Sequence, residues 1–512
     1  MAVGATGRTR RRATRSIGRV VVTGFALALT VEAAAGAAPP SLTPGAGDAV
    51  QIFPMQVPPL AKVEGALLRG DGYGSSLYPV PGTSDELYGL TDRGPNVFLP
   101  DGTVVEPLPS FQPAIGKFRL QNGAATLEQT IPLTDGNGAP YSGRANAQNP
   151  RGQRIVDLAG AVLPADPNGY DPEGLVALPD GTFWVSDEYG PFITHFDAAG
   201  RQINRLSPFD GSLPRELATR VGNRGLEGLT VTPDGSTLVA IMQSALQSPD
   251  LGSADPMQIA IVRVVTYRLV TGELHEYLYL LDNPGTNRTA VSEIAALSNH
   301  SFVVLERDGN FPPGAYKKLW HIDLAGATDV GPNSSVAGAR YDGARGGLLI
   351  GGRTLEALVA GQDTNAAAAT LRGHDITPVS ATLALDLGAL LDRLDARGRF
   401  FSHDKIEGLY VDPSGTRIIL SNDDDFGIGG VASPTPPLQL TEKVSPATGR
   451  QDAGEFLIID TARLPAFVQS ATAVLNAGAT PTSTAAATAT PALRLTAPVQ
   501  RARRRRAPQP QP

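Results

Sequence analysis

Four segments of this 512-residue chain share one plan, and their recurrence limits the possible folds more than any other feature. Each segment has Glu near its start, followed by Gly in three of the four, and then alternating apolar residues. A turn such as Pro-Asp-Gly leads into a second β-branched run that ends in acidic or amide residues. Alternation on both sides of a short turn predicts a β-hairpin. The segments begin at Asp171, Gly225, Val291 and Lys405, and a looser fifth copy begins at Asp71.

Further strand-like runs follow the hairpins, such as FITHFD, IVRVVTYRL, KLWHIDL and EFLIID. Each unit then becomes a four-stranded antiparallel sheet, and serial sheets of this kind make an all-β protein, a β-propeller. A β-sandwich would explain the strands but not their recurrence. The spacing from Glu173 to Glu227 and from Glu227 to Glu293 fits one blade each, whereas the longer spacing to Glu407 fits two blades or one blade with an insertion. We expect six blades, with five or seven as alternatives.

Amino-acid composition excludes several kinds of site. The chain has 57 Gly and 43 Pro, which favours many turns over long helices. It contains no Cys, so it has no disulfide, no thiolate nucleophile and no Cys–zinc site. The six His lack the HExxH spacing of a zinc site, and neither a G-x-S-x-G elbow nor a GxxxxGK[ST] loop is present.

The two ends of the chain differ from the rest. Residues 1–38 carry a basic region, an apolar run and small residues suited to cleavage, which predicts a signal peptide; a membrane anchor is the alternative. Residues 39–59 are expected to form a linker, residues 60–465 the propeller, and residues 466–512 a disordered Ala/Thr/Pro-rich tail. The basic end of the tail is either solvated or contacts an anionic polymer or lipid. We therefore expect a secreted or periplasmic (cell-envelope) protein with no membrane span after cleavage.

Charge is unevenly distributed along the chain. The whole sequence has a net charge of −7, but both ends are basic, and residues 39–464 hold 31 Lys and Arg against 49 Asp and Glu, a net charge of −18. Such an acidic domain is poorly suited to nucleic acid, because phosphate binding requires basic surfaces. Clustered carboxylates instead favour a bound cation. We expect a monomer that acts on a small-molecule ester or phosphoester.

Hairpin geometry brings the acidic residues together. The start of the first strand and the end of the second lie at the same end of a hairpin. If the hairpins are the inner strands of the blades, their acids surround one mouth of the central channel. The expected groups are Glu173 with Asp187 and Glu188, Glu227 with Gln243, Glu293 with Glu306 and Asp308, Glu407 with Asp423, Asp424 and Asp425, and Asp92 at the end of the loose first hairpin.

Many converging carboxylates favour Ca²⁺ over Mg²⁺. The alternative is that each acid caps its own turn. Asp187 and Glu188 are also suited to general acid or base chemistry. The candidate metal ligands are Asp92, Glu173, Asp187, Glu227, Glu306, Glu407, Asp423 and Asp424, and the candidate catalytic residues are Asp187, Glu188 and Glu407.

Basic residues alternate with these acids along the sequence. Arg93, Arg224, Arg307 and Lys405 each adjoin or lie close to an acidic motif residue. Cations beside a carboxylate-bound metal ion suit an anionic substrate such as a phosphate. Mutual salt bridges across blades are the alternative. These four residues are the candidate substrate-binding groups.

The motifs together resemble the phytase-like family, also described as "esterase-like activity of phytase". The resemblance covers about residues 60–465 and rests on TDRGPN (91–96), DPEGL (171–175), WVSDEYGPF (184–192), NRGLEGLT (223–230), LERDG (305–309), KIEGLYVD (405–412) and SNDDDFG (421–427). It implies an exported β-propeller with hydrolase activity toward phosphate or other esters. The resemblance also implies that nine acidic residues occupy motif positions: Asp92, Glu173, Asp187, Glu188, Glu227, Glu306, Glu407, Asp423 and Asp424. Gln243 stands where an acid would complete the pattern. A calcium-dependent lactonase or esterase, and a propeller that binds a ligand without catalysis, remain alternatives.

Overall fold

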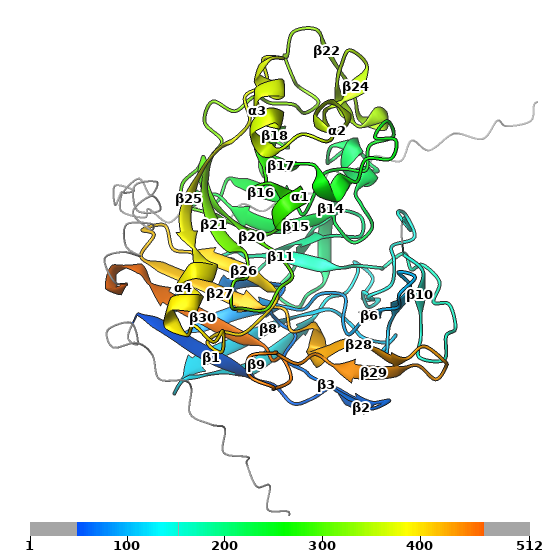
Figure 1. The fold of residues 1–512 in the computed structure, drawn as a ribbon, viewed down its shortest axis with the longest axis vertical. Coiled ribbons are helices and arrows are strands. Elements are labelled where there is room, and N and C mark those ends of the chain that lie inside the picture. The colour runs from blue at the N-terminus through cyan, green and yellow to red at the C-terminus, as the bar shows by residue number, and fades with distance from the viewer. Residues whose placement is uncertain (1–48, 152, 465–512) are drawn as a thin grey trace, which may run out of the picture. The chain divides into compact units, whose positions relative to one another are not determined.

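The computed structural model describes residues 49–151 and 153–464, and the predicted signal peptide (1–38) and tail (466–512) lie outside them. Three sheets of the described residues have four antiparallel strands each, and one eight-stranded sheet divides into two further units of four antiparallel strands, so the described part of the chain has five blades. Figure 1 shows how these sheets are arranged. Blade 1 contains β4 (Ser76–Pro79), β5 (Glu86–Leu90), β8 (Ala114–Gln121) and β9 (Ala124–Pro132). Blade 2 contains β11 (Pro172–Ala177), β12 (Phe183–Asp187), β13 (Ile193–Phe196) and β14 (Gln202–Leu206).

The other three blades follow the same order from the inner to the outer strand. Blade 3 contains β15 (Leu226–Val231), β16 (Thr237–Met242), β17 (Ile261–Arg268) and β18 (Leu274–Leu280). Blade 4 contains β19 (Ala290–Ala296), β20 (Ser301–Arg307), β21 (Lys317–Asp323) and β25 (Ser380–Asp386). Blade 5 contains β26 (Ile406–Val411), β27 (Arg417–Asn422), β30 (Glu455–Asp460) and β1 (Val50–Gln56).

The five inner strands form a closed ring. Each of β4, β11, β15, β19 and β26 contacts the inner strand of the next blade, and β26 contacts β4. These strands belong to the five predicted hairpins, so the β-propeller fold and the inner position of the motif are confirmed. The turn glycines Gly181, Gly235 and Gly415 have φ of +85°, +71° and +69°, the left-handed region in which glycine carries no steric penalty.

The described residues form five blades, one of the two alternatives, rather than the favoured six. The long spacing between Glu293 and Glu407 comes from an insertion between β21 and β25 of blade 4. The insertion holds β22 (Ala339–Asp342), β23 (Gly347–Ile350), β24 (Arg353–Thr354), α2 (Leu355–Val359) and α3 (Thr364–Arg372). Its apolar residues, including Leu355 and Leu371, pack with Ile261 and Leu278 on the outer strands of blade 3. In Figure 1, α3 of the insertion lies beside β18. The insertion is long enough to form a blade, but its apolar residues cover the outer strands of blade 3 instead.

The predicted linker, residues 39–59, also needs correction. Within it, β1 is the outer strand of blade 5, where Val50 pairs with Ile459 of β30 in antiparallel register. Met55 at the end of β1 then pairs in parallel with Ala125 of β9 in blade 1. The N-terminal strand therefore joins the last blade to the first, and the propeller begins at residue 50. Pro54 lies within β1, which is compatible with the position of β1 as an outer strand.

Short elements outside the blades build the surroundings of the channel mouth or cover the blades. The strands are β2 (Ala61–Val63), β3 (Ala66–Leu68), β6 (Val97–Phe98), β7 (Val104–Val105), β10 (Ile155–Val156), β28 (Ile428–Ser433) and β29 (Gln439–Glu442). The helices are α1 (Pro284–Asn287), α4 (Leu387–Leu394) and the 3₁₀ turns η1 (Arg215–Thr219), η2 (Pro256–Gln258), η3 (Gly343–Arg345), η4 (Asp425–Gly427) and η5 (Thr461–Arg463). None of the helices in the described part of the chain is both long and apolar enough to cross a membrane.

Candidate functional site

A cavity of about 690 Å³ lies at the end of the channel where the inner strands begin and the second strands end. Hairpin register produces this arrangement, since Pro172 pairs with Asp187 and Ile406 with Asn422. All five blades or their loops contribute to the lining. Its volume falls in the range of small-molecule sites. The predicted residues that line it are Asp92, Arg93, Glu173, Glu188, Arg224, Glu227, Arg307, Lys405, Glu407 and Asp423.

A β-bulge explains the Glu-Gly pair of the motif. Strand register shifts at Glu173, Glu227 and Glu407, where an extra residue interrupts the pairing of the two inner strands. A bulge can turn a side chain away from the face on which strand alternation would place it, and all three glutamates line the cavity. The following glycine allows neighbouring blades to approach closely: a Cβ on Gly174 would lie 2.6 Å from the Leu229 backbone nitrogen.

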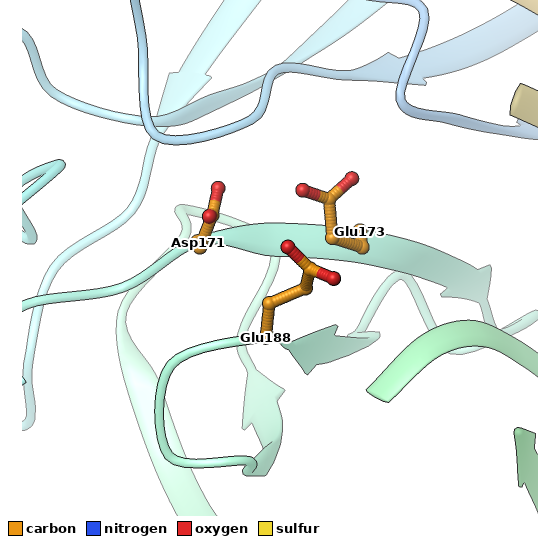
Figure 2. Close-up of side chains that lie close together, drawn as sticks. All are labelled: Asp171, Glu173 and Glu188. Atoms are coloured by element: carbon orange, nitrogen blue, oxygen red, sulfur yellow. The ribbon is translucent and has the colours of Figure 1, made fainter. Parts of the chain in front are cut away.

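Three carboxylates of blade 2 converge at the cavity (Figure 2). Asp171 precedes β11, Glu173 lies in β11, and Glu188 follows β12. Each offers an oxygen within 4.8 Å of the others, and all three side chains are buried. We call Asp171, Glu173 and Glu188 the acidic triad.

The acidic triad is electrostatically unsatisfied. Burial and the neighbouring Asp171 carboxylate raise the pKa of Glu188 to about 7. Burial, together with Asp171 and Glu227, also raises the pKa of Glu173 well above its usual value. Asp171 Oδ2 and Glu188 Oε1 accept no hydrogen bond from the described residues, and neither does Oε2 of the adjacent Glu227. Buried carboxylate oxygens without donors fit a bound cation, which would remove the repulsion among them.

The basic side chains of the cavity lie partly in blades 4 and 5 and partly near the acidic triad of blade 2. In blades 4 and 5, Arg307 forms an ion pair with Glu407, and Lys405 Nζ lies 2.8 Å from Asp423 Oδ2. Near the acidic triad, Arg93 Nη1 is 3.7 Å from Asp171 Oδ2. Acids of blades 4 and 5 are therefore neutralised by neighbouring side chains, and the triad side retains the excess negative charge.

Arg224 differs from the other cations in this cavity. Its Nη1 donates a 2.6 Å hydrogen bond to the neutral Gln243 Oε1, and no carboxylate of the described residues lies within ion-pair distance of it. Burial lowers the pKa of Arg224, although the Glu188 and Glu227 carboxylates oppose this. The guanidinium still carries its charge at neutral pH, because an Arg pKa starts far above 7. Arg224 thus has donors that can bind an anion.

Three predicted metal ligands lie outside the cavity lining. Asp187, also a predicted catalytic residue, accepts hydrogen bonds from the backbone nitrogens of Asp171, Tyr189 and Gly190 at 2.8, 3.1 and 2.6 Å. Glu306 accepts hydrogen bonds from the hydroxyls of Tyr279 and Tyr316. These two carboxylates hold loops and strands of the blades together, so we correct their predicted assignment.

The third such residue, Asp424, accepts a 2.9 Å hydrogen bond from Phe426 N and lies 3.7 Å from the Arg69 guanidinium. Glu293 is predicted to lie near Glu306 and Asp308; its backbone pairs with Leu305, next to Glu306, but its carboxylate contacts blades 1 and 3. In blade 4 the bulge residue is Ser292, and Glu293 occupies the position that the motif glycine has in the other blades. The Glu293 carboxylate therefore accepts hydrogen bonds from Leu229 N at 2.8 Å and from Ser76 Oγ at 2.5 Å.

Sequence reasoning missed several cavity residues. Asp171 is the first residue of the DPEGL motif, two positions before Glu173, so the motif itself indicates a further carboxylate near Glu173. Arg288 and Lys443 carry no such signal, because they lie in connections that do not recur among the blades. The missed lining residues with ionisable or amide side chains are Asp171, Asn96, Asn223, Arg288, Asp308, Asp404, Asp425, Glu442 and Lys443, with Asp308 and Asp425 foreseen only as neighbours of the predicted ligands.

A family model and a curated protein match parts of this chain in sequence. The family model described as "Phytase-like: Esterase-like activity of phytase" matches residues 72–426. An "Uncharacterized secreted protein" of Arthroderma benhamiae is 28% identical over 234 residues, which cover 36% of this chain and 45% of that protein. The match thus spans less than half the length of that curated relative.

The solved structures that match this chain are distant in sequence and superpose on it with low TM-scores. PhoX of Pseudomonas fluorescens in complex with vanadate is 10% identical, with a TM-score of 0.31, covering 84% of this chain and 97% of that one. A protein from Lactobacillus plantarum is 11% identical, with a TM-score of 0.30, covering 79% of this chain and 94% of that one. Likeness at this level supports no inference about activity.

Proposed function

The chain belongs to the phytase-like family, and on that premise we propose that it is an exported, calcium-dependent hydrolase of a phosphoester or another ester. The proposal rests on the acidic triad in the cavity at the channel mouth. Three buried carboxylates, two of which (Asp171 and Glu188) have an oxygen that accepts no hydrogen bond from the described residues, are unfavourable by themselves and become favourable around a hard cation. Export is supported by the signal-like N-terminus and by the name of the secreted relative.

Asp171, Glu173 and Glu188 would hold the ion, and Asp92 and Glu227 add negative charge around it. Bound Ca²⁺ would supply positive charge that polarises a phosphoryl or acyl oxygen. Ca²⁺ is favoured because the donors are carboxylates without nitrogen ligands.

Protein groups would carry out the remaining steps. Hydrolysis adds a water oxygen to phosphorus or to the acyl carbon and releases an alcohol, so one proton leaves the water and one reaches the alcohol. Glu227 is placed to hold the proton that leaves the water, because its Oε2 accepts no hydrogen bond from the described residues and its pKa is raised by burial and by Glu188. Arg224 would orient the anionic oxygens, and Glu407 would keep Arg307 directed along the cavity.

Calcium titration calorimetry tests the metal site directly. We expect Glu188→Gln to lose at least about ten-fold in calcium affinity, since an ion-binding carboxylate becomes a neutral amide. Glu128→Gln is the matched control, because Glu128 is exposed on β9 and pairs with Arg119 outside the cavity. Equal calcium affinity in wild type and Glu188→Gln would contradict the site.

A second measurement tests catalysis. Purified protein should be assayed against phosphomonoesters, aryl esters and lactones with Ca²⁺ and with chelator. We expect turnover of one class that requires Ca²⁺ and is lost in Glu188→Gln. Calcium binding without turnover of any class would support a ligand-binding propeller instead.

A further inference from the structure

The loops around the cavity carry a feature that the acidic triad does not explain. The connection between the second and third strands supplies at least one apolar side chain to the cavity in each of blades 1, 3, 4 and 5, and in each of them one such side chain is exposed or half-buried. These side chains are Phe98, Met257, Phe311 and Val444, which we call the apolar rim. Polar hydrolase cavities with fully charged substrates have no need of such a rim.

The apolar rim is accessible and lacks an internal packing role. Phe98 is 53% exposed and Val444 is 44% exposed, while Met257 and Phe311 are half-buried. None of the four belongs to an apolar core cluster among the described residues. Exposed apolar side chains grouped at a binding cavity indicate contact with a ligand.

Two rim residues lie next to cations of the cavity. The Arg93 guanidinium is 5.8 Å from the centroid of the Phe98 ring, and Lys443 Nζ is 6.0 Å from that of Phe311. An anionic group bound beside Arg93 or Lys443 would therefore place an attached hydrocarbon group beside an aromatic ring. One cavity of about 690 Å³ thus offers charged groups for an anionic head and the apolar rim for an attached apolar group.

We propose that the substrate is an amphipathic ester, with one anionic or metal-binding head and an alkyl or aryl group that contacts the apolar rim. This inference rests on the proposed function and narrows its substrate class. A compact polyphosphate such as inositol hexakisphosphate fits this cavity less well, because the rim would desolvate its charges without compensating them.

Binding of non-hydrolysable phosphonates tests the inference without requiring turnover. In saturating Ca²⁺, calorimetry should show hexylphosphonate binding at least about ten-fold more tightly than methylphosphonate, as partial burial of five added methylenes predicts. Phe98→Ser combined with Val444→Ser should reduce that ratio several-fold, because the longer chain loses the apolar surface that it contacts. Phe209→Ser is the matched control, because Phe209 is 43% exposed and lies outside the cavity lining.

The outcomes separate this inference from the proposed function. Equal affinities for hexylphosphonate and methylphosphonate in the wild type, with both bound only in the presence of Ca²⁺, would overturn the amphipathic substrate and leave the calcium-dependent site standing. A chain-length ratio unchanged in the double variant would overturn the role of the rim. Failure of both phosphonates to bind in saturating Ca²⁺ would overturn the inference and the anion-binding part of the proposed function together.

Discussion

The Glu293 carboxylate of blade 4 accepts a 2.5 Å hydrogen bond from the Ser76 hydroxyl of blade 1, although these two blades are not neighbours in the ring. The same Ser76 oxygen accepts a hydrogen bond from Leu175 N of blade 2, and Glu293 accepts another from Leu229 N of blade 3. Four inner strands are therefore linked through one carboxylate. This network joins the inner strands across the channel that they surround.

Replacing Glu293 should reveal that structural role. Glu293→Ala removes the acceptor for Leu229 N and Ser76 and opens a space in the channel, so we expect a loss of about 2–4 kcal/mol in unfolding free energy. Glu293→Gln keeps one acceptor oxygen and the volume, so its loss should stay below about 1.5 kcal/mol. Urea unfolding measures both values. Comparable losses in the two variants would argue against the network.

Gly174 provides a test of how closely the blades pack. A Cβ at this position would lie 2.6 Å from Leu229 N and 2.4 Å from Ser186 Oγ. Since backbone cannot move aside cheaply in a ring, Gly174→Ala should cost about 3 kcal/mol or more in unfolding free energy, or prevent folding. Gly309→Ala is the control, because nothing lies within 4 Å of its Cβ position. Similar unfolding curves for Gly174→Ala and wild type would contradict the tight contact.

The neighbouring residues Asp187 and Glu188 should behave differently. Asp187 satisfies three backbone nitrogens outside the cavity lining, so Asp187→Asn is expected to lower stability by about 1–3 kcal/mol without changing calcium affinity per folded molecule. Glu188→Gln is expected to lower calcium affinity, and it removes repulsion within the triad, so stability without Ca²⁺ should not fall. Thermal unfolding and calcium calorimetry on both variants make the comparison. Loss of calcium affinity in Asp187→Asn would return that residue to the metal site.

Bound calcium should also stabilise the folded protein. A ligand that binds only the native state adds about 2.7 kcal/mol at one hundred times its Kd. Melting curves in excess Ca²⁺ and in chelator should therefore differ by several degrees, and Glu188→Gln should show a smaller difference. Coincident wild-type curves would count against a calcium site.

His403 gives the fold a pH-dependent contribution to stability. Burial lowers the pKa of His403, but the Asp452 and Glu455 carboxylates, at 2.6 and 3.1 Å, outweigh burial and raise it to about 9. The raised pKa means that this contribution is full below about pH 6.5 and is lost as the pH rises through 9, by up to about 1.4 kcal/mol per pH unit. Urea unfolding between pH 6.5 and 9 should show a shallower decline in His403→Gln. Parallel pH profiles would rule out this contribution.

Local repetition made the inner hairpins and the end of the channel that carries the acids predictable. Alternation and turn residues specify a hairpin, and hairpin geometry alone places Glu173 and Glu188 at the same end. The blade number was not predictable in the same way. Apolar residues of the insertion, such as Leu355 and Leu371, are of the same types as the core residues of a blade, so the sequence alone does not distinguish the two.

Individual side-chain directions depend on single-residue offsets that a repeat conceals. Glu293 and Glu173 look equivalent in the sequence, yet a bulge at Ser292 rather than at the glutamate places the Glu293 carboxylate in the channel. Which carboxylates are neutralised also depends on contacts between blades, such as the ion pair of Arg307 with Glu407. Such contacts join residues far apart in the chain, so no local pattern records them.

Arg224 offers the sharpest separation of anion binding from metal binding. Its side chain lies in the cavity with Gln243 as its hydrogen-bond acceptor, so its charge is available to a bound anion. Arg224→Ala should weaken methylphosphonate binding in saturating Ca²⁺ by about ten-fold or more, the value of a charge-assisted hydrogen bond, while calcium affinity changes little. Arg224→Lys should recover part of the loss, because an ammonium keeps the charge but cannot form paired hydrogen bonds. Arg340→Ala is the matched control, since the Arg340 side chain is 68% exposed and pairs with Asp342. If Arg224→Ala binds methylphosphonate as wild type does, the anion is held by other groups, and the proposed orientation of the ester is wrong.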